Sequence, residues 1–223
     1  MFLQVLTDVV LGGQPLEPRL PFILSWLVAI TIGLTVHEFA HAYAADRLGD
    51  PTPRANGRVS LNPLDHYDPI GTTMILLFGI GWGKPVPVNP QNYRKPRRDN
   101  LIVSAAGVAT NLLVAVLAAI PIRFGLAGEY LLPLSVLVLL NLLLAFFNLL
   151  PLGPLDGAHV LESLLPRGKS WRFRQFSQQW GGRLLMLLIA ADWLLRIPIL
   201  STLIVTPVLY LGRLLTGAAW LWF

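Results

Sequence analysis

The stretch PFILSWLVAITIGLTVHEFAHAYAA, residues 21–45, decides the fold. It is apolar for most of its length, and about 20 such residues suffice for a helix to cross the hydrocarbon core of a membrane. Its last third carries His37, Glu38 and His41, although ionisable side chains are costly inside a membrane and usually mark a functional site there. The stretch therefore predicts a membrane-spanning helix with a reactive centre near its C-terminal end.

The composition of the whole chain agrees with a membrane protein. Of its 223 residues, 54% are hydrophobic and only 13% are charged, whereas about a quarter of the residues in a soluble domain are charged. The chain has no cysteine, which excludes both a disulfide framework and a thiolate metal site. A metal ion would therefore be bound by histidines and carboxylates.

Most of the lysines and arginines lie in three stretches, residues 47–58, 84–98 and 167–183, each between apolar runs. Cytoplasmic loops of membrane proteins carry such an excess of basic residues. We therefore attribute the net charge of +5 to membrane topology and expect no nucleic-acid partner. If residues 68–83 do not fully cross the membrane, counting the predicted spans places the N-terminus outside and the three basic stretches in the cytoplasm.

Further apolar runs predict the remaining transmembrane helices. Residues 101–122 and 130–155 contain no charged side chain, and each run is long enough to span a membrane. The C-terminal runs, residues 184–195 and 197–223, predict one or two more spans. Residues 1–20 are mixed in character, and we expect them to lie at the membrane interface.

Residues 68–83 are apolar and glycine-rich but short for a span, so we expect them to form a re-entrant or interfacial segment. The prolines of residues 84–90 exclude a helix there and permit an extended edge strand. The expected fold is an all-α polytopic membrane protein of about five to six transmembrane helices, with a short re-entrant or β element near the cytoplasmic face. We expect a single membrane-embedded domain over residues 1–223, with a core at 21–165 and C-terminal helices at 183–223.

The HEFAH sequence at residues 37–41 is the strongest chemical motif. On a helix, positions i and i+4 share one face, so His37 and His41 can bind one zinc ion. Glu38 is then placed to act as general base toward a water molecule. The alternative is an interfacial cluster of His37, Glu38 and His41 that merely faces water.

A zinc hydrolase generally has three protein ligands, so another histidine or carboxylate is required. Asp156 stands out, because it follows the proline-broken end of the run at 130–155. His159 lies three residues further on and remains a competing ligand. Asp192 is expected to pair with Arg196 at i, i+4. The other candidates near apolar runs are His66, Asp68, Glu129 and Glu162.

Two motifs together resemble the site-2 protease family. HEFAH at residues 37–41 and NLLPLGPLDG at residues 148–157 match that family's HExxH and N-x-x-P-x-x-P-x-D-G patterns. The resemblance implies that His37, His41 and Asp156 bind Zn²⁺ and that Glu38 activates the water molecule. It also implies that Asn148 helps to hold the substrate or polarises the scissile carbonyl.

Three other segments are similar to family segments. Residues 104–111 resemble an S-x-A-G-P-x-x-N helix in which Val108 replaces the proline, although close helix packing also explains their small side chains. Residues 83–89 resemble an extended loop near the substrate, so we hypothesise that this edge pairs with unwound substrate; a structural hairpin is the alternative. His66 lies in a third such segment, where a loop-capping role is favoured. No segment resembles a PDZ or CBS domain, which implies a minimal family member.

The expected function is that of an intramembrane zinc metalloprotease, which hydrolyses peptide bonds in or near transmembrane segments in regulated intramembrane proteolysis. Its partners would be the lipid bilayer and a membrane-anchored protein substrate. The expected location is the cell membrane, with a multi-pass chain and an active site nearer the cytoplasmic side. Two alternatives are a metal-binding or transport protein and a catalytically silent scaffold. Glu38→Gln separates hydrolysis from transport, because hydrolysis needs the base and transport does not, and the intact ligand set together with Glu38 argues against the scaffold.

Overall fold

The computed structural model describes residues 19–78 and 81–217, and no strand is present in these ranges. The long helices are α2 (Leu20–Arg47), α5 (Pro96–Arg123), α6 (Leu131–Asn148) and α10 (Ile199–Thr216). The shorter helices are α3 (Thr52–Ala55), η2 (Pro63–His66), α4 (Pro69–Phe78), η3 (Pro90–Asn92), η4 (Gly128–Tyr130), α7 (Asp156–Leu164), α8 (Arg167–Phe176), η5 (Ser177–Gly181) and α9 (Gly182–Leu194). The predicted all-α class is confirmed.

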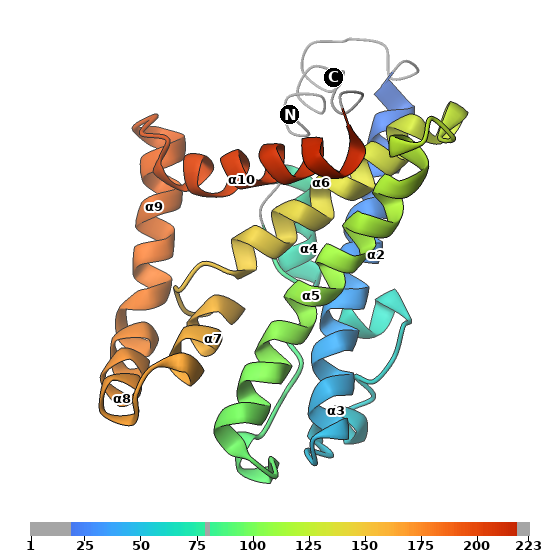
Figure 1. Ribbon diagram of the computed structural model, residues 1–223. Coiled ribbons are helices and arrows are strands. Elements are labelled where there is room, and N and C mark those ends of the chain that lie inside the picture. The colour runs from blue at the N-terminus through green and yellow to red at the C-terminus, as the bar shows by residue number, and fades with distance from the viewer. Residues whose placement is uncertain (1–18, 79–80, 218–223) are drawn as a thin grey trace.

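Helices α2, α5 and α6 pack against one another and form the core of the molecule (Figure 1). On α2 the buried side recurs every three or four residues, at Trp26, Ala29, Gly33, His37 and His41. This spacing places residues on one face of a helix. The two histidines therefore continue the face by which α2 packs into the bundle.

The buried face of α5 is built largely from small side chains. Ser104, Gly107, Ala115 and Ala118 are among its buried residues, and small residues allow membrane helices to approach closely. The prediction that residues 104–107 serve helix packing is thus supported at Ser104 and Gly107. Val108, which stands where the related motif has proline, is also buried, and α5 continues through it without a break.

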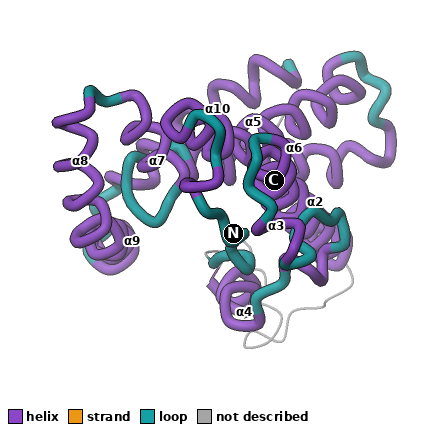
Figure 2. Tube along the Cα trace, turned by 90° about the horizontal axis from the view of Figure 1, so that it is seen from below, coloured by secondary structure: helices purple, strands orange, loops and turns teal. Residues whose placement is uncertain are grey.

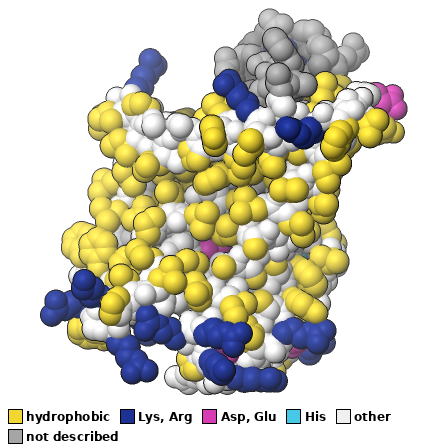
Figure 3. All heavy atoms as spheres, in the orientation of Figure 1, with side chains coloured by type: hydrophobic (Ala, Val, Ile, Leu, Met, Phe, Trp, Pro, Cys, Tyr) yellow, Lys and Arg dark blue, Asp and Glu magenta, His cyan; other side chains and the backbone are white. Residues whose placement is uncertain are grey.

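Within the described residues, four helical segments are long and apolar enough to cross a membrane: α2, α5, α10, and η4 together with α6. In Figure 3 hydrophobic side chains cover the middle of the molecule, and lysines and arginines gather along its lower edge. Figure 1 shows α3 and α8 at that edge. Helix α4 has 10 residues and α9 has 13, so neither is a full span by itself. The re-entrant path of residues 68–83 stays a prediction.

The C-terminal part departs from a simple bundle. Helices α8, η5 and α9 follow one another without interruption, and they lie with α7 to one side of the bundle when it is seen from below (Figure 2). Helix α10 runs across α5 and α6 and contacts both (Figure 1). The predicted segment at residues 1–20 lies, up to residue 18, outside the described residues, as does the end of the run at 197–223.

The expected pairing of Asp192 with Arg196 is wrong. Helix α9 ends at Leu194, and Arg196 has a positive φ of 54°, so the two side chains are not on one helical face. Asp192 Oδ2 instead accepts a hydrogen bond from the backbone N–H of Ser201 at 2.6 Å. Asp192 therefore caps the first turn of α10.

The segment at residues 81–89 is extended, as its prolines predict, but it pairs with no strand in the described ranges. One backbone hydrogen bond, from Lys84 N–H to the carbonyl oxygen of His66 at 2.9 Å, joins it to the preceding loop. Pro85 and Pro87 remove two of the donors that a ladder would need. The segment is therefore extended without forming the short strand that the sequence permitted, and the backbone N–H groups of Lys84, Val86 and Asn89 already have partners.

Candidate metal centre

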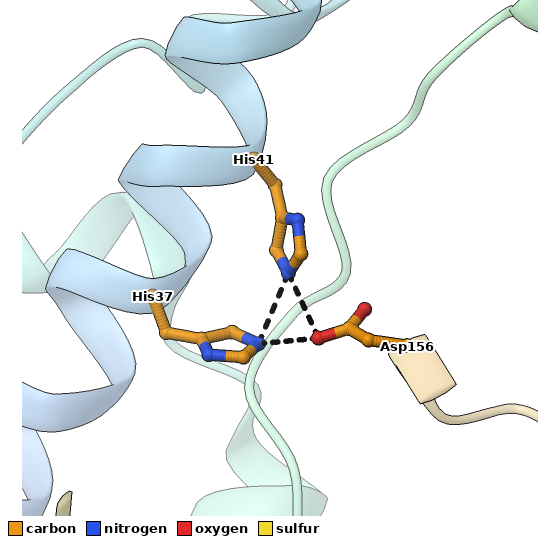
Figure 4. Close-up of side chains that lie close together, drawn as sticks. All are labelled: His37, His41 and Asp156. Atoms are coloured by element: carbon orange, nitrogen blue, oxygen red, sulfur yellow. Dashed lines mark hydrogen bonds and ion pairs between the residues drawn. The ribbon is translucent and has the colours of Figure 1, made fainter. Parts of the chain in front are cut away.

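Three side chains converge where α2 meets the start of α7 (Figure 4). His37 Nε2 and His41 Nε2 are 3.0 Å apart, and each lies 3.2 Å from Asp156 Oδ2. Both histidines are buried, and Asp156 is half-buried. No other group of three potential ligands is found in the described ranges. The geometry thus brings together the two histidines and the carboxylate that the sequence singled out.

Local sequence places Asp156 at this point. Helix α6 ends at Asn148, a loop that contains Pro151 and Pro154 follows, and α7 begins at Asp156 itself. A side chain at Gly157 would have its Cβ only 2.2 Å from the carbonyl oxygen of Leu149. Glycine is therefore required where the chain turns back against the end of α6, and this turn presents Asp156 to α2.

The second nitrogen of each imidazole is held by α5. His41 Nδ1 lies 2.7 Å from the carbonyl oxygen of Val103, and His37 Nδ1 lies 2.6 Å from Asn111 Oδ1. A carbonyl oxygen only accepts hydrogen bonds, so His41 carries its proton on Nδ1 and a lone pair on Nε2. Gly107 makes room for both rings, because a Cβ there would lie 2.4 Å from His41 Nε2 and 2.7 Å from His37 Cε1.

The convergent atoms fit a metal ion. Asp156 Oδ2 is buried and has no hydrogen-bond donor in the described part of the chain. Lone pairs that face one another at 3.0–3.2 Å repel unless a cation lies among them. Neighbouring ligands of a four-coordinate zinc ion are about 3.3 Å apart, given metal–ligand distances of about 2.0–2.1 Å. The donor set and its spacing therefore suit zinc.

Glu38 lies one residue past His37, and the extended segment passes beside it. Its Oε2 accepts a hydrogen bond from the backbone N–H of Val86 at 3.2 Å. The guanidinium of Arg58 donates to the carbonyl oxygen of Lys84 in the same segment. Burial lowers the pKa of Arg58, while the charge of Glu38 opposes that shift. Glu38 therefore accepts a hydrogen bond from a backbone donor, and its charge acts on the cation Arg58.

The other predicted residues lie apart from the three convergent side chains. Asn148 donates from Nδ2 to the carbonyl oxygen of Leu144 at 2.9 Å, within its own helix. His159 is exposed and faces Glu162 at 4.0 Å, so the geometry favours Asp156 over this rival ligand. His66 is buried, and its Nε2 lies 2.8 Å from the carbonyl oxygen of Ser60, which agrees with the favoured loop-capping role.

Asp50 is a fully buried residue that the sequence did not single out. Its carboxylate accepts hydrogen bonds from Thr52, from the backbone N–H of Asn89 at 2.6 Å and from Asn92 Nδ2 at 2.8 Å. Burial alone would raise the pKa of Asp50, but these donors outweigh it and lower the pKa below its ordinary value. Asp50 thus ties the end of α2 to the end of the extended segment.

Comparison with known proteins gives the class of the molecule. The profile of peptidase family M50 matches residues 125–188. The Bacillus subtilis protein named "Putative zinc metalloprotease YwhC" is 35% identical over 197 residues, which are 84% of this chain and 86% of that protein. Membrane helices, a His-His-Asp centre and this similarity together define a membrane zinc metalloprotease.

Two mycobacterial proteins, each named "Putative zinc metalloprotease Rip2", are also similar to this chain. The protein of Mycolicibacterium smegmatis is 32% identical over 75% of this chain, and that of Mycobacterium tuberculosis H37Rv is 34% identical over 68%. The chain spans 65% and 62% of their lengths. No solved structure matches the chain significantly. The chain belongs to peptidase family M50, the site-2 protease family.

Proposed function

We propose that the chain hydrolyses peptide bonds in or near the transmembrane segments of membrane-anchored proteins, and so serves regulated intramembrane proteolysis. The observation that carries the proposal is the depth of the convergent centre on a membrane helix. His37 lies ten residues before Arg47, the last residue of α2, and ten helical residues extend about 15 Å. A catalytic group at that depth would meet a peptide bond within or next to the bilayer.

In this proposal His37, His41 and Asp156 are the ligands of Zn²⁺. When bound, zinc supplies Lewis-acid chemistry, which makes water a stronger nucleophile and polarises a carbonyl group. Glu38 takes a proton from the attacking water and later gives it to the leaving amine. Its side chain is half-buried, and its Oε2 accepts a hydrogen bond from the backbone N–H of Val86.

Asn148 is proposed to bind the substrate. Its Nδ2 group carries two protons, and one of them bonds to the carbonyl oxygen of Leu144. The other is proposed to hold the substrate backbone or to stabilise charge on the scissile carbonyl oxygen, as a hydrogen-bond donor does in an oxyanion hole. The cell membrane is the proposed location. The centre lies nearer the end of α2 that carries Arg47, which is the cytoplasmic end by the positive-inside rule.

The proposal is tested by measuring zinc content and cleavage of a model transmembrane substrate in detergent. Glu38→Gln should keep zinc and lose cleavage, because it removes only the base. Asp156→Ala should lose or weaken zinc binding, and His159→Gln is the matched control that should change neither. A wild-type protein without zinc, or cleavage by Glu38→Gln at the wild-type rate, would refute the proposed chemistry.

A further inference from the structure

A chain of buried amide groups leads from His37 through two neighbouring helices. Asn111 on α5 places its Oδ1 2.6 Å from His37 Nδ1, and its Nδ2 donates to Asn141 Oδ1 on α6 at 2.9 Å. Both asparagines have no exposed surface. Buried amides inside a membrane bundle are costly unless they are hydrogen-bonded, so this chain is a built feature of the α2–α5–α6 contact.

Two backbone carbonyls fix the direction of every hydrogen bond in the chain. Asn141 Nδ2 donates to the carbonyl oxygen of Leu137 at 2.9 Å, so Asn141 must turn its Oδ1 toward Asn111. Asn111 Nδ2 donates both to that Oδ1 and to the carbonyl oxygen of Gly33 at 3.0 Å. Because an amide nitrogen has two protons, both are used. Only the oxygen of Asn111 remains for His37.

We propose that Asn111 and Asn141 are positioning residues that fix the tautomer of His37. Since Asn111 Oδ1 accepts, His37 Nδ1 must donate, and the proton of the neutral ring lies on Nδ1. The lone pair of Nε2 then faces His41 Nε2 and Asp156 Oδ2 at 3.0 and 3.2 Å. The role of this tautomer in zinc binding rests on the proposed function. The position of the proton itself follows from the hydrogen bonds alone.

Each of the two histidines has its Nδ1 oriented by an oxygen acceptor, but the two acceptors differ. The carbonyl oxygen of Val103 orients His41 directly, whereas Asn111 orients His37 only if its own amide is correctly turned. Asn141 fixes the orientation of the Asn111 amide by accepting a hydrogen bond from its Nδ2. Partners of this kind fix ligand orientation in metal sites, and their loss typically costs about 10–100-fold in metal affinity.

The first test reads the tautomer directly in the wild-type protein. Zinc-free protein labelled with ¹⁵N-histidine is studied in detergent at a pH where the imidazoles are neutral, and His37→Gln assigns the signals. A one-bond ¹⁵N–¹H correlation at His37 Nδ1, with none at Nε2, is expected. A proton on Nε2 would overturn the inference. This measurement needs no variant of either asparagine to fold.

The second test uses Co²⁺ affinity and the visible Co²⁺ spectrum. Asn111→Leu and Asn141→Leu should each weaken binding about 10–100-fold and change the spectrum. Asn141→Asp should restore most of the affinity, because it keeps the acceptor for Asn111 Nδ2. Thr110→Val is the matched control on α5, because the Thr110 hydroxyl bonds only to the carbonyl oxygen of Ala106 in its own helix.

The outcomes separate this inference from the proposed function. If the wild-type protein binds Co²⁺ and both leucine variants bind it equally well, the positioning role is wrong while the metal centre stands. If Thr110→Val weakens binding as much as Asn111→Leu does, the effect is general packing and the inference is again overturned. If the wild-type protein binds neither Zn²⁺ nor Co²⁺, the proposed function itself fails.

Discussion

The backbone N–H of Val86 donates a hydrogen bond to Glu38 Oε2 at 3.2 Å, so the extended segment touches the proposed catalytic base directly. Gly83 lies beside the same side chain, where an added Cβ would be 3.9 Å from Glu38 Cγ. The segment that we hypothesise to bind substrate therefore also contacts the carboxylate of Glu38.

Replacing Val86 with proline removes this donor without adding bulk elsewhere. Proline suits the extended backbone, so the segment should keep its path while Glu38 loses its hydrogen bond. We expect cleavage to fall about 10-fold, which corresponds to about 1.4 kcal/mol in the barrier, with zinc content unchanged. Val86→Ala keeps the N–H and should cleave like the wild type. Equal rates for Val86→Pro and Val86→Ala would exclude a role for this amide.

Arg58 should govern how firmly the segment is held. Arg58 is 3% exposed, and its guanidinium donates to the carbonyl oxygen of Lys84 and lies 3.4 Å from His66 Nδ1. Arg58→Met should therefore speed hydrogen exchange of the peptide at residues 81–92 and slow cleavage, with zinc retained. Arg54→Met is the control, because Arg54 is exposed and pairs only with Asp46. Unchanged exchange in Arg58→Met would show that the other contacts suffice.

The parts of the site that were predictable depend on spacing within one element. His37 and His41 had to share a helix face whatever the rest of the chain did. The end of α6 before Asp156 followed from the prolines at 151 and 154. The motif around Asp156 selected this carboxylate over His159, and the structure places Asp156, and not His159, beside the two histidines.

The parts that were missed join distant loops and helices. Asn111 meets His37 across 74 positions, and Asp50 meets Asn89 across 39, and no periodicity in the sequence encodes such contacts. A weaker indication was present in Asn141, the polar amide within an otherwise apolar stretch of α6. A polar side chain in a membrane helix usually faces the bundle interior, and this rule would have drawn attention to it.

Asp50 predicts a pH dependence of stability. Its pKa is lowered in the folded state, so its ionised form stabilises the fold above the unfolded value of about 3.9, and this stabilisation is lost as pH falls through the lowered folded pKa. In Asp50→Asn an amide NH₂ group faces N–H donors that need an acceptor. We expect this change to lower the free energy of unfolding by about 1–3 kcal/mol at pH 7.

Thermal unfolding in detergent checks this dependence. The difference in midpoint between wild type and Asp50→Asn should be largest at neutral pH and should shrink below about pH 4. Glu129→Gln, at an exposed position in the helical turn η4, should show no such difference at either pH. A difference that stays constant from pH 7 to pH 3 would assign the effect to shape rather than to the charge of Asp50.

Gly107 should prove as necessary for metal binding as a ligand. A Cβ at this position would lie 2.4 Å from His41 Nε2 and 2.8 Å from His37 Nδ1, and the two rings are already confined by their contacts with Val103 and Asn111. Gly107→Ala must therefore push the rings out of place or separate α5 from α2. We expect a loss of zinc affinity of about 10-fold or more, with helix content unchanged because alanine favours helix over glycine. Gly168→Ala is the matched control, since a Cβ there meets open space and should leave zinc binding intact. Zinc bound by Gly107→Ala with the wild-type affinity would mean that the imidazoles do not rest against α5 when the metal is present.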